Sequence, residues 1–282
     1  MYAQPTRLDE ALDLAARYQP RILAGGTDVM VGAGVDLAGP VLDITRIPEI
    51  KGIALDADGV TIGAGVTWAD LLRADLPGGF AGLKAAAREV GSVQIQNRAT
   101  IAGNLCNASP AADGVPPLLT LDAELEIRSS SGQRKMPLQD FITGNRRTRL
   151  ETGELVTAIR APRSLAEGRS SFVKLGSRRY LVISIVSVAA LLRTDAAGTI
   201  EVARIAVGAC SAVPKRLPSV EALLTGQHLS EQLLARIEAQ HFAELTPIDD
   251  VRASADYRRD AAVQVVRQAI LECITGRPGG MA

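Results

Sequence analysis

The spacing of apolar residues predicts an N-terminal unit in which a helix is followed by two short strands. Between residues 7 and 18, apolar side chains stand at positions 8, 11, 12, 15 and 16, which is the period of an amphipathic helix. Pro20 ends this pattern, because proline cannot continue the hydrogen-bond ladder of a helix. The apolar runs 21–24 and 41–44 predict strands, the first of which feeds a glycine turn. The pattern predicts a small α/β unit that extends to about residue 50.

From residue 52 onward the pattern predicts a second mixture of helices and strands. Thr67 is a candidate helix cap, since a threonine hydroxyl accepts a hydrogen bond from the first turn of a helix. Alternating apolar and charged residues over 123–128 predict a strand with one exposed face. The stretches 100–113 and 140–149 predict loops. The remaining predicted elements are strands at 60–63 and 154–161 and helices at 68–74, 82–90 and 116–121.

From about residue 170 onward, the pattern of apolar residues predicts an antiparallel sheet followed by helices. Three apolar runs read as strands, and a turn at 195–198 joins the last two. The strands are expected at 171–175, 184–193 and 200–210, and helices at 219–225, 230–240 and 256–275. These changes of pattern divide the chain into residues 1–50, 51–169 and 170–282.

Composition narrows the class of protein. The chain of 282 residues has a net charge of zero and is 47% hydrophobic but only 3% aromatic, so its core must be aliphatic. It lacks the basic excess with which proteins neutralise nucleic-acid phosphates, and nucleic acid is not expected as a partner. The longest apolar run, over 180–192, is shorter than the roughly 20 residues that span a bilayer. The first ten residues hold no apolar signal core, and we expect a soluble cytoplasmic protein.

The cysteines and histidines do not predict a metal site. Cys106, Cys210 and Cys273 lie far apart and form no C-x-x-C pair, which argues against a disulfide framework, a zinc site and an iron–sulfur cluster. The two histidines, His228 and His241, fall in the polar C-terminal part, where they are expected on solvated helices.

Two runs of small and hydrogen-bonding residues carry the candidate chemistry. One covers residues 23–28 and the other residues 100–113. Glycine and alanine let a backbone approach a ligand closely, and threonine, asparagine and serine side chains donate hydrogen bonds to phosphate or sugar. No G-x-G-x-x-G motif follows a strand, so a nicotinamide-type Rossmann fold is not expected. Either run alone is compatible with an ordinary loop, but the pair favours a nucleotide cleft.

The two runs resemble the two signatures of the FAD-binding (medium) subunit of the molybdenum hydroxylases, the family of xanthine dehydrogenase and carbon monoxide dehydrogenase. Four further stretches fall in the order found in that family, so the resemblance covers nearly the whole chain: 62–68, 96–99, 174–179 and 253–258. It implies an α+β fold, with a two-subdomain FAD-binding part (vanillyl-alcohol-oxidase-like, PCMH type) followed by a C-terminal domain of antiparallel sheet plus helices.

The resemblance also implies a set of residues that contact non-covalent FAD. The first signature would line the pyrophosphate with Leu23, Ala24, Gly25, Gly26, Thr27, Asp28 and Val29, and the second with Thr100, Ile101, Ala102, Gly103 and Asn104. Further implied contacts are Ser109, Asp113, Val156 and Lys174. Asp28 could instead bond backbone amides, since a diphosphate would repel its carboxylate.

Lys174 matches a family lysine near the flavin ring, where it would stabilise negative charge on the reduced ring, and it is the candidate catalytic residue. The alternative is a surface lysine at the end of a strand. The loop that follows, with Arg178, Arg179 and Tyr180, lies close to the ring in relatives.

The implied function is an FAD-binding electron-transfer subunit of a molybdopterin-dependent hydroxylase or dehydrogenase. A large partner subunit would hold the molybdopterin and a small one the [2Fe–2S] clusters, and FAD would pass electrons to NAD⁺, oxygen or another acceptor. One alternative is a self-sufficient oxidase or dehydrogenase of the same fold. Its FAD would be non-covalent, because the chain has no histidine before residue 228 and the usual covalent link near the first signature is therefore excluded. Another is a binding or scaffold protein without turnover. The sequence leaves the substrate, the acceptor and the stoichiometry open.

Overall fold

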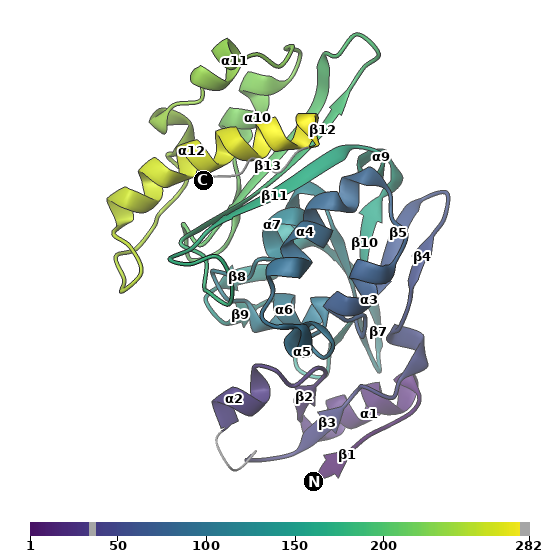
Figure 1. The fold of residues 1–282 in the computed structure, drawn as a ribbon. Helices are drawn as coiled ribbons and strands as arrows, with labels where there is room; N and C mark the ends of the chain where they lie inside the picture. Colours follow the sequence, from purple (N-terminus) through teal and green to yellow (C-terminus); the bar gives the residue numbers. More distant parts are fainter. Residues whose placement is uncertain (34–37, 277–282) are drawn as a thin grey trace.

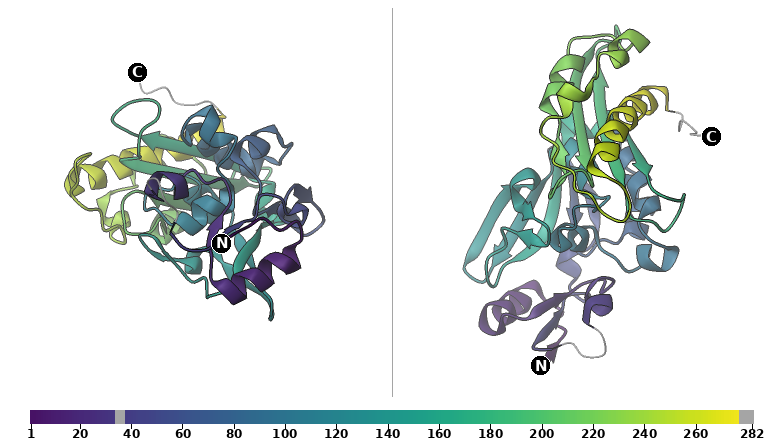
Figure 2. Two further views of the ribbon diagram at one scale, coloured as in Figure 1. Left: turned by 90° about the horizontal axis from the view of Figure 1, so that it is seen from below. Right: turned by 90° about the vertical axis from the view of Figure 1, so that its left-hand side faces the viewer.

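The computed structural model describes residues 1–33 and 38–276, and it arranges them as three larger β-sheets, which follow one another along an elongated molecule, and one two-stranded hairpin (Figure 1). The N-terminal sheet lies at one end, a central sheet with most of the short helices lies in the middle, and the C-terminal sheet lies at the other end (Figure 2). This mixed arrangement of helices and sheets confirms the α+β fold class expected from the sequence.

The N-terminal sheet has parallel strands in the order β1-β3-β2. Its elements are β1 (Tyr2–Ala3), α1 (Leu8–Tyr18), β2 (Arg21–Leu23), α2 (Val29–Ala33) and β3 (Val41–Asp43). The periodicity predicts α1 correctly, because its inward face consists of Leu8, Ala11, Leu12 and Ala15, all buried. The helix ends at Gln19, which takes a left-handed conformation with φ of 46°.

The central sheet is antiparallel, in the order β4-β5-β10-β6-β7. Its strands are β4 (Ile53–Leu55), β5 (Gly59–Gly63), β6 (Glu124–Ser129), β7 (Gly132–Pro137) and β10 (Leu155–Pro162). The helices and the small hairpin around it are η1 (Pro48–Ile50), α3 (Trp68–Arg73), η2 (Gly78–Phe80), α4 (Ala81–Glu89), α5 (Val93–Gln96), α6 (Ile101–Asn107), α7 (Val115–Thr120), α8 (Leu138–Phe141), β8 (Ile142–Gly144) and β9 (Arg147–Thr148). Thr67 caps α3 as predicted, in a reciprocal capping box with Asp70.

The C-terminal sheet is antiparallel, in the order β11-β12-β13-β14. Its elements are α9 (Arg163–Ala166), β11 (Arg169–Leu175), β12 (Val186–Thr194), β13 (Ile200–Gly208), β14 (Lys215–Arg216), α10 (Pro218–Leu224), α11 (Glu231–Ala235), η3 (Ala239–Phe242) and α12 (Ala255–Thr275). The long helix α12 covers one face of this sheet (Figure 2), and α4 and α7 pack on the other. Within the described ranges, no helix combines the length and the apolar character that crossing a bilayer requires.

The strand β12 explains why the C-terminal sheet is fixed to the central part of the protein. Val186, Val188 and Ala190 join the core under α12, whereas Ala189 and Leu191 face the central helices. Alternate side chains of a strand point to opposite faces of a sheet, so a strand that is buried on both sides reads as one continuous apolar run. The nearly continuous apolar run of β12, interrupted only by the buried Ser187, is therefore explained by burial on both faces.

Two loop predictions are wrong. Residues 101–107 of the predicted loop 100–113 form α6, with Thr100 as its N-cap. The predicted loop 140–149 contains the end of α8 and the hairpin of β8 and β9. Both stretches are rich in residues of low helix or strand propensity, and packing against the rest of the protein overrides that preference. The helix predicted over 230–240 is confirmed only as the shorter α11.

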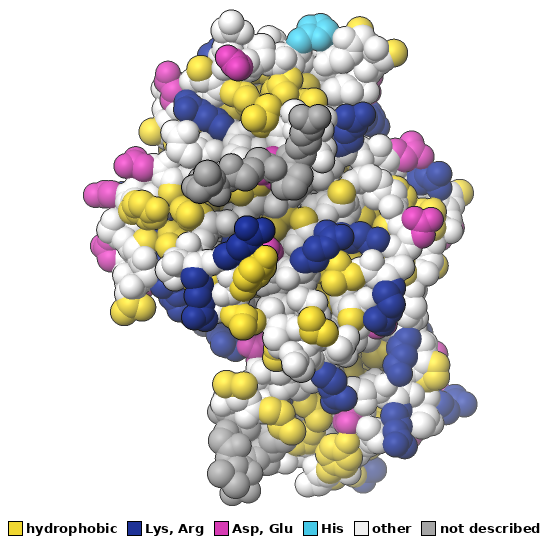
Figure 3. Space-filling view, in the orientation of Figure 1, with side chains coloured by type: hydrophobic (Ala, Val, Ile, Leu, Met, Phe, Trp, Pro, Cys, Tyr) yellow, Lys and Arg dark blue, Asp and Glu magenta, His cyan; other side chains and the backbone are white. Residues whose placement is uncertain are grey.

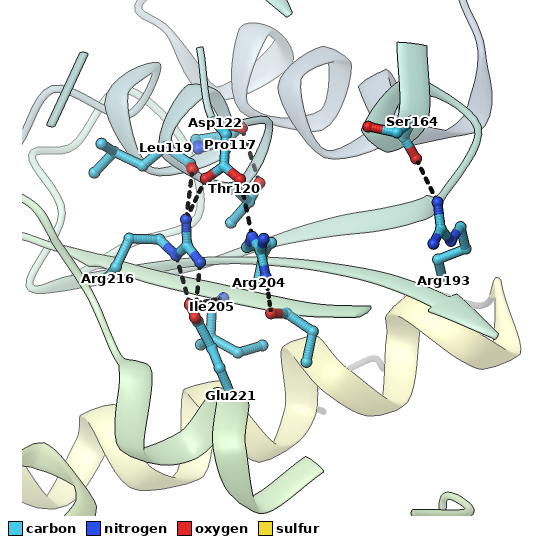
Figure 4. Close-up of polar contacts among 11 residues, drawn as sticks. Pro117, Leu119, Thr120, Asp122, Ser164, Arg193, Arg204, Ile205, Arg216 and Glu221 are labelled. Carbon is cyan, nitrogen blue, oxygen red and sulfur yellow. Dashed lines mark hydrogen bonds and ion pairs between the residues drawn. The ribbon is translucent and has the colours of Figure 1, made fainter. Parts of the chain in front are cut away.

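Charged side chains join the end of α7 to the C-terminal sheet (Figure 4). Asp122 follows α7, and its carboxylate accepts a hydrogen bond from Arg204 Nε of β13 at 3.0 Å. Arg216 of β14 donates to the same carboxylate, to the carbonyl of Leu119 at 3.3 Å, and to Glu221 Oε2 of α10 at 2.7 Å. Arg216 thus occupies the centre of a joint between the central helices and the C-terminal sheet.

The variant Arg216→Met is expected to lower the free energy of unfolding by about 3 kcal/mol, because it leaves the nearly buried carboxylate of Glu221 without its partner. Arg259→Met is the matched control, since Arg259 pairs with Asp256 on the exposed side of α12 and such pairs contribute roughly 0–1 kcal/mol. Chemical denaturation followed by circular dichroism measures both effects. Equal losses in the two variants would contradict this account of the joint.

Candidate functional site

A cavity of about 340 Å³ lies between the turn that follows β2 and the helix α6. The turn, residues 24–29, forms one wall, and Thr100 with α6 forms the other. The space-filling view shows the molecule narrowing between its N-terminal end and its body (Figure 3). The residues that line the cavity are Ile22, Ala24, Gly25, Gly26, Thr27, Asp28, Val29, Ile44, Ala64, Trp68, Val90, Ile95, Ala99, Thr100, Ala102, Gly103, Asn104, Cys106, Asn107, Leu150, Glu154, Leu155 and Val156.

The turn of residues 24–29 lines the cavity and has backbone amides without hydrogen-bond partners in the described chain. Gly26 has a φ of 77°, a conformation that glycine adopts without strain. In the described part of the chain, the amides of Gly25, Gly26, Thr27 and Asp28 donate no hydrogen bond. Successive free amides in a turn form a concave site for an anion. This wall therefore fits a diphosphate without any cationic side chain.

Gly25 brings the turn against the second wall. A Cβ atom on Gly25 would lie 2.1 Å from the carbonyl oxygen of Arg98 and 2.8 Å from the Cα of Ala99. Real Cβ atoms do not approach backbone atoms so closely, so only glycine permits this contact. The segment that leads into α6 is thereby held beside the turn, although about seventy residues separate the two in sequence.

The start of α6 offers a further free amide. The hydroxyl of Thr100 accepts from the amide of Gly103 at 3.0 Å, and the amide of Ile101 donates to the carbonyl of Val66 at 3.1 Å. The amide of Ala102 makes no hydrogen bond within the described residues. The small side chains of Ala102 and Gly103 leave the cavity open beside this amide.

The charges of the cavity wall are both negative, but one of them is already paired. Among the lining residues only Asp28 and Glu154 carry charge. Glu154 receives hydrogen bonds from Arg134 Nε at 2.6 Å and Nη2 at 2.7 Å. These hydrogen bonds hold the pKa of Glu154 below its usual value, although partial burial opposes the shift. Apolar side chains such as Val90, Ile95 and Leu150 complete a wall suited to flat rings.

Most of the residues expected at the site line this one cavity. They are Ala24, Gly25, Gly26, Thr27, Asp28, Val29, Thr100, Ala102, Gly103, Asn104 and Val156. Leu23 belongs to β2 and Ile101 is fully buried in the core, so neither side chain is among the lining residues. Ser109, Asp113 and Lys174 are not among them either. Asp28 accepts a hydrogen bond from Asn107 Nδ2 at 3.0 Å, rather than from backbone amides.

Asp113 and Lys174 form a buried ion pair. Lys174 Nζ lies 2.7 Å from Asp113 Oδ2, and Ser184 Oγ donates to Asp113 Oδ1 at 2.6 Å. Both charged side chains are more than nine-tenths buried, so Lys174 is not a surface lysine. Burial raises the pKa of the Asp113 carboxyl, and the charge of Lys174 and the hydroxyl of Ser184 oppose that shift.

The same carboxylate fixes both ends of one loop. Lys174 lies near the end of β11 and Ser184 just before β12. Because both side chains bond the carboxylate of Asp113, the two ends of the connection between β11 and β12 are held close together. The loop exposes Tyr180, Leu181 and Ile183, and Leu181 adopts a left-handed conformation with φ of 52°. The sequence does not reveal this arrangement, because it joins residues 61 and 71 positions apart.

Several lining residues were not expected from the sequence. Val90, Ile95, Leu150 and Glu154 stand outside the signatures, and an apolar or paired side chain gives no local signal of ligand contact. Their positions follow from the close approach of α4, α5 and β10 to the turn, which is a property of the tertiary structure.

Comparison with known proteins identifies the class. Residues 1–164 match the family described as FAD binding domain in molybdopterin dehydrogenase, and residues 171–273 match the CO dehydrogenase flavoprotein C-terminal domain. The chain is 32% identical to the nicotinate dehydrogenase FAD-subunit of Eubacterium barkeri, covering 98% of this chain and 96% of that protein. It is 31% identical to the xanthine dehydrogenase FAD-binding subunit of Escherichia coli O157:H7, covering 99% and 97%.

Solved structures agree with the sequence relatives. The carbon monoxide dehydrogenase of Hydrogenophaga pseudoflava aligns with a TM-score of 0.87 and 28% identity, over 97% of this chain and 96% of that one. Quinoline 2-oxidoreductase of Pseudomonas putida 86 aligns with a TM-score of 0.86 and 26% identity, over 98% and 97%. The chain belongs to the family of FAD-binding medium subunits of the molybdenum hydroxylases, and it is an FAD-binding oxidoreductase subunit.

The variant Gly25→Ala is expected to weaken FAD binding at least tenfold. Its methyl group would push the turn away from Arg98, and the free amides would no longer converge on one anion. A tenfold change corresponds to about 1.4 kcal/mol. Gly144→Ala is the control, since a Cβ there meets only ordinary contacts, at 3.6 Å from Arg147 Cδ. Titration of each apoprotein with FAD, followed by flavin fluorescence, gives the affinities. An unchanged affinity for Gly25→Ala would show that this contact does not shape the FAD site.

Proposed function

We propose that this protein is the flavin subunit of a molybdopterin-dependent hydroxylase or dehydrogenase, which receives electrons from [2Fe–2S] clusters on a small partner and passes them to NAD⁺, oxygen or another acceptor. The observation that carries this proposal is the cavity whose two walls are the two signature runs, with free backbone amides on both. Relatives named as medium chains or FAD-subunits over almost their full length support the division of labour with a large molybdopterin subunit.

In this proposal FAD binds without a covalent link, and its diphosphate lies between residues 24–29 and the start of α6. The amides of Gly25, Gly26 and Ala102 would hold the phosphate oxygens. Val156, on β10, would meet the ring with its backbone. FAD supplies the chemistry of accepting and releasing electrons singly or in pairs, and the chain supplies binding, orientation and electrostatics.

Lys174 remains the candidate residue for tuning the ring. Its ammonium group is buried and points to Asp113, so the electric field it exerts on a neighbouring ring is that of an ion pair and not of a free cation. A sugar hydroxyl that bonds Asp113 would compete with Ser184 for Oδ1 and with Lys174 for Oδ2. Asp113 therefore orients Lys174 in this proposal, in addition to the expected contact with the nucleotide.

A self-sufficient oxidase or dehydrogenase with non-covalent FAD is the second candidate. Such an enzyme needs a substrate pocket beside the ring on the same chain. The chain aligns over 95% or more of its length with proteins named as FAD or medium subunits of dehydrogenases and a hydroxylase, which differ in the substrates that they are named for, and this favours the subunit over the alternative.

Gly103→Val is expected to abolish FAD binding while the protein stays folded. A Cβ on Gly103 already lies 2.8 Å from Thr100 Oγ1, so the larger side chain must displace the cap and enter the space beside the free amide of Ala102. Equilibrium dialysis measures bound FAD, and circular dichroism checks the fold.

In the wild type, acid precipitation should leave all of the flavin in the supernatant; flavin in the pellet would contradict non-covalent binding.

The chain alone is expected to catalyse no hydroxylation of purines, aldehydes, N-heterocycles or carbon monoxide, because its proposed role is restricted to electron transfer through FAD. It should still pass electrons from dithionite to a tetrazolium dye. Adding the large and small subunits should produce substrate-dependent reduction of the flavin, measured as bleaching near the flavin absorption maximum. Rapid substrate oxidation by the chain with FAD as its sole cofactor would refute the subunit function and support the self-sufficient enzyme.

A further inference from the structure

Three polar side chains from separate segments meet at the rim of the cavity. Asp28 belongs to the turn of residues 24–29, Asn107 is the last residue of α6, and Arg146 lies between β8 and β9. Asn107 Nδ2 donates to Asp28 Oδ1 at 3.0 Å, and Arg146 Nη1 donates to Asn107 Oδ1. Both ends of the amide are engaged, so its orientation is fixed with the nitrogen toward the carboxylate.

The backbone holds Arg146 in the position from which it reaches Asn107. Arg146 has a φ of 59°, a left-handed conformation that non-glycine residues adopt uncommonly. Its amide donates to the carbonyl of Ala108 at 2.9 Å, and Ala108 is itself the left-handed C-cap of α6. The tip of the β8–β9 hairpin is therefore attached to the C-terminal end of α6. This backbone hydrogen bond keeps the guanidinium of Arg146 beside Asn107.

The position of this cluster relates it to the cofactor. Asp28 and Asn107 line the 340 Å³ cavity, whereas Arg146 stands behind Asn107 and is not among the lining residues. In the described part of the chain, the hydrogen bond from Asn107 to Asp28 is the one that ties the turn of residues 24–29 to the chain beyond residue 50. Otherwise the turn meets that wall through packing, chiefly at Gly25.

We propose that Asp28, Asn107 and Arg146 form a latch that closes the turn over bound FAD and sets how slowly FAD leaves the protein. This inference rests on the assignment of the cavity to FAD. A diphosphate held by amides of both walls can leave only when the walls separate, and separation breaks the hydrogen bond between Asn107 and Asp28. Asn107 and Arg146 are thus positioning residues.

Arg146 strengthens the latch through Asn107. Its positive charge polarises the amide of Asn107 and makes the amide nitrogen a better donor to Asp28. The carboxylate of Asp28, which by itself would repel a diphosphate, accepts the hydrogen bond from Asn107 and so holds the turn in place.

The test measures FAD release from the full-length protein. Asn107→Ala, Arg146→Ala and the control Arg147→Ala, which alters the neighbouring exposed arginine, are loaded with FAD and diluted, and free flavin is followed by fluorescence in a stopped-flow instrument. Losing a charge-assisted hydrogen bond predicts release about tenfold faster for Asn107→Ala and about threefold faster for Arg146→Ala. Arg147→Ala should release FAD at the wild-type rate, and association rates should agree within about twofold.

The double variant distinguishes a latch from two unrelated contacts. Because Arg146 acts through Asn107, removing both side chains should speed release no more than Asn107→Ala alone. Arg146→Lys, which keeps the charge, should restore most of the wild-type rate. Each apoprotein should melt within about 4 °C of the wild type, since the exposed hydrogen bonds contribute little without FAD. A much lower melting temperature would make the cluster a general structural support and overturn the latch.

Failure of the latch and failure of the FAD assignment give different results. Release at the wild-type rate from both Asn107→Ala and Arg146→Ala, while Gly103→Val binds no FAD, would overturn the latch and leave the cofactor site intact. Wild-type affinity in Gly103→Val would overturn the assignment of the cavity itself.

Discussion

The contact between Gly25 and the Arg98 carbonyl is the constraint on which the rest of the site depends. It is a steric condition rather than an attraction, because any side chain at Gly25 would overlap the backbone. It places the turn after β2 beside the entry to α6, and Gly25 lines both the 340 Å³ cavity and an adjoining hollow of about 570 Å³ that Lys51, Thr67 and Arg98 help to line. One glycine thus determines where two parts of the chain come together.

Binding through backbone amides has an electrostatic consequence. A diphosphate held by lysine or arginine side chains loses affinity as salt screens the charges, whereas fixed peptide dipoles in a partly enclosed site are screened less. Three cations in this region of the described chain bind other groups: Arg134 binds Glu154, Lys174 binds Asp113, and Arg146 binds Asn107. In the proposed site these side chains hold the structure, and the peptide groups would meet the anion.

The sequence predicts the fold class and most of the cavity, but not the contacts that assemble them. The helix α1 has a periodic apolar pattern and the buried strand β12 an almost wholly apolar one, so local sequence is sufficient to predict both. Residues 24–29 and 100–104 are recognisable because close approach to a ligand needs glycine, alanine and hydroxyl groups in succession. The pairs of Asp113 with Lys174 and of Asp28 with Asn107 join residues 61 and 79 positions apart, and no local pattern records them. The helix α6 was missed because its glycine and asparagines are poor helix formers, and the Thr100 cap and buried Ile101 and Leu105 compensate for them.

The packing of the three sheets indicates which wall of the cleft moves. The C-terminal sheet is buried on both faces between α12 and the central helices, and charged residues around Arg216 and Asp113 fasten it further. The N-terminal unit shares a core with the central part through residues such as Leu12, Leu42 and Ile47. Beside the cavity, it is tied to the body by the packing of Gly25 and the hydrogen bond from Asn107 to Asp28. Local opening follows the region with the fewest buried contacts. In the proposed site, the cofactor would therefore enter and leave where the turn of residues 24–29 meets α6, while the C-terminal sheet that holds Lys174 would keep its geometry.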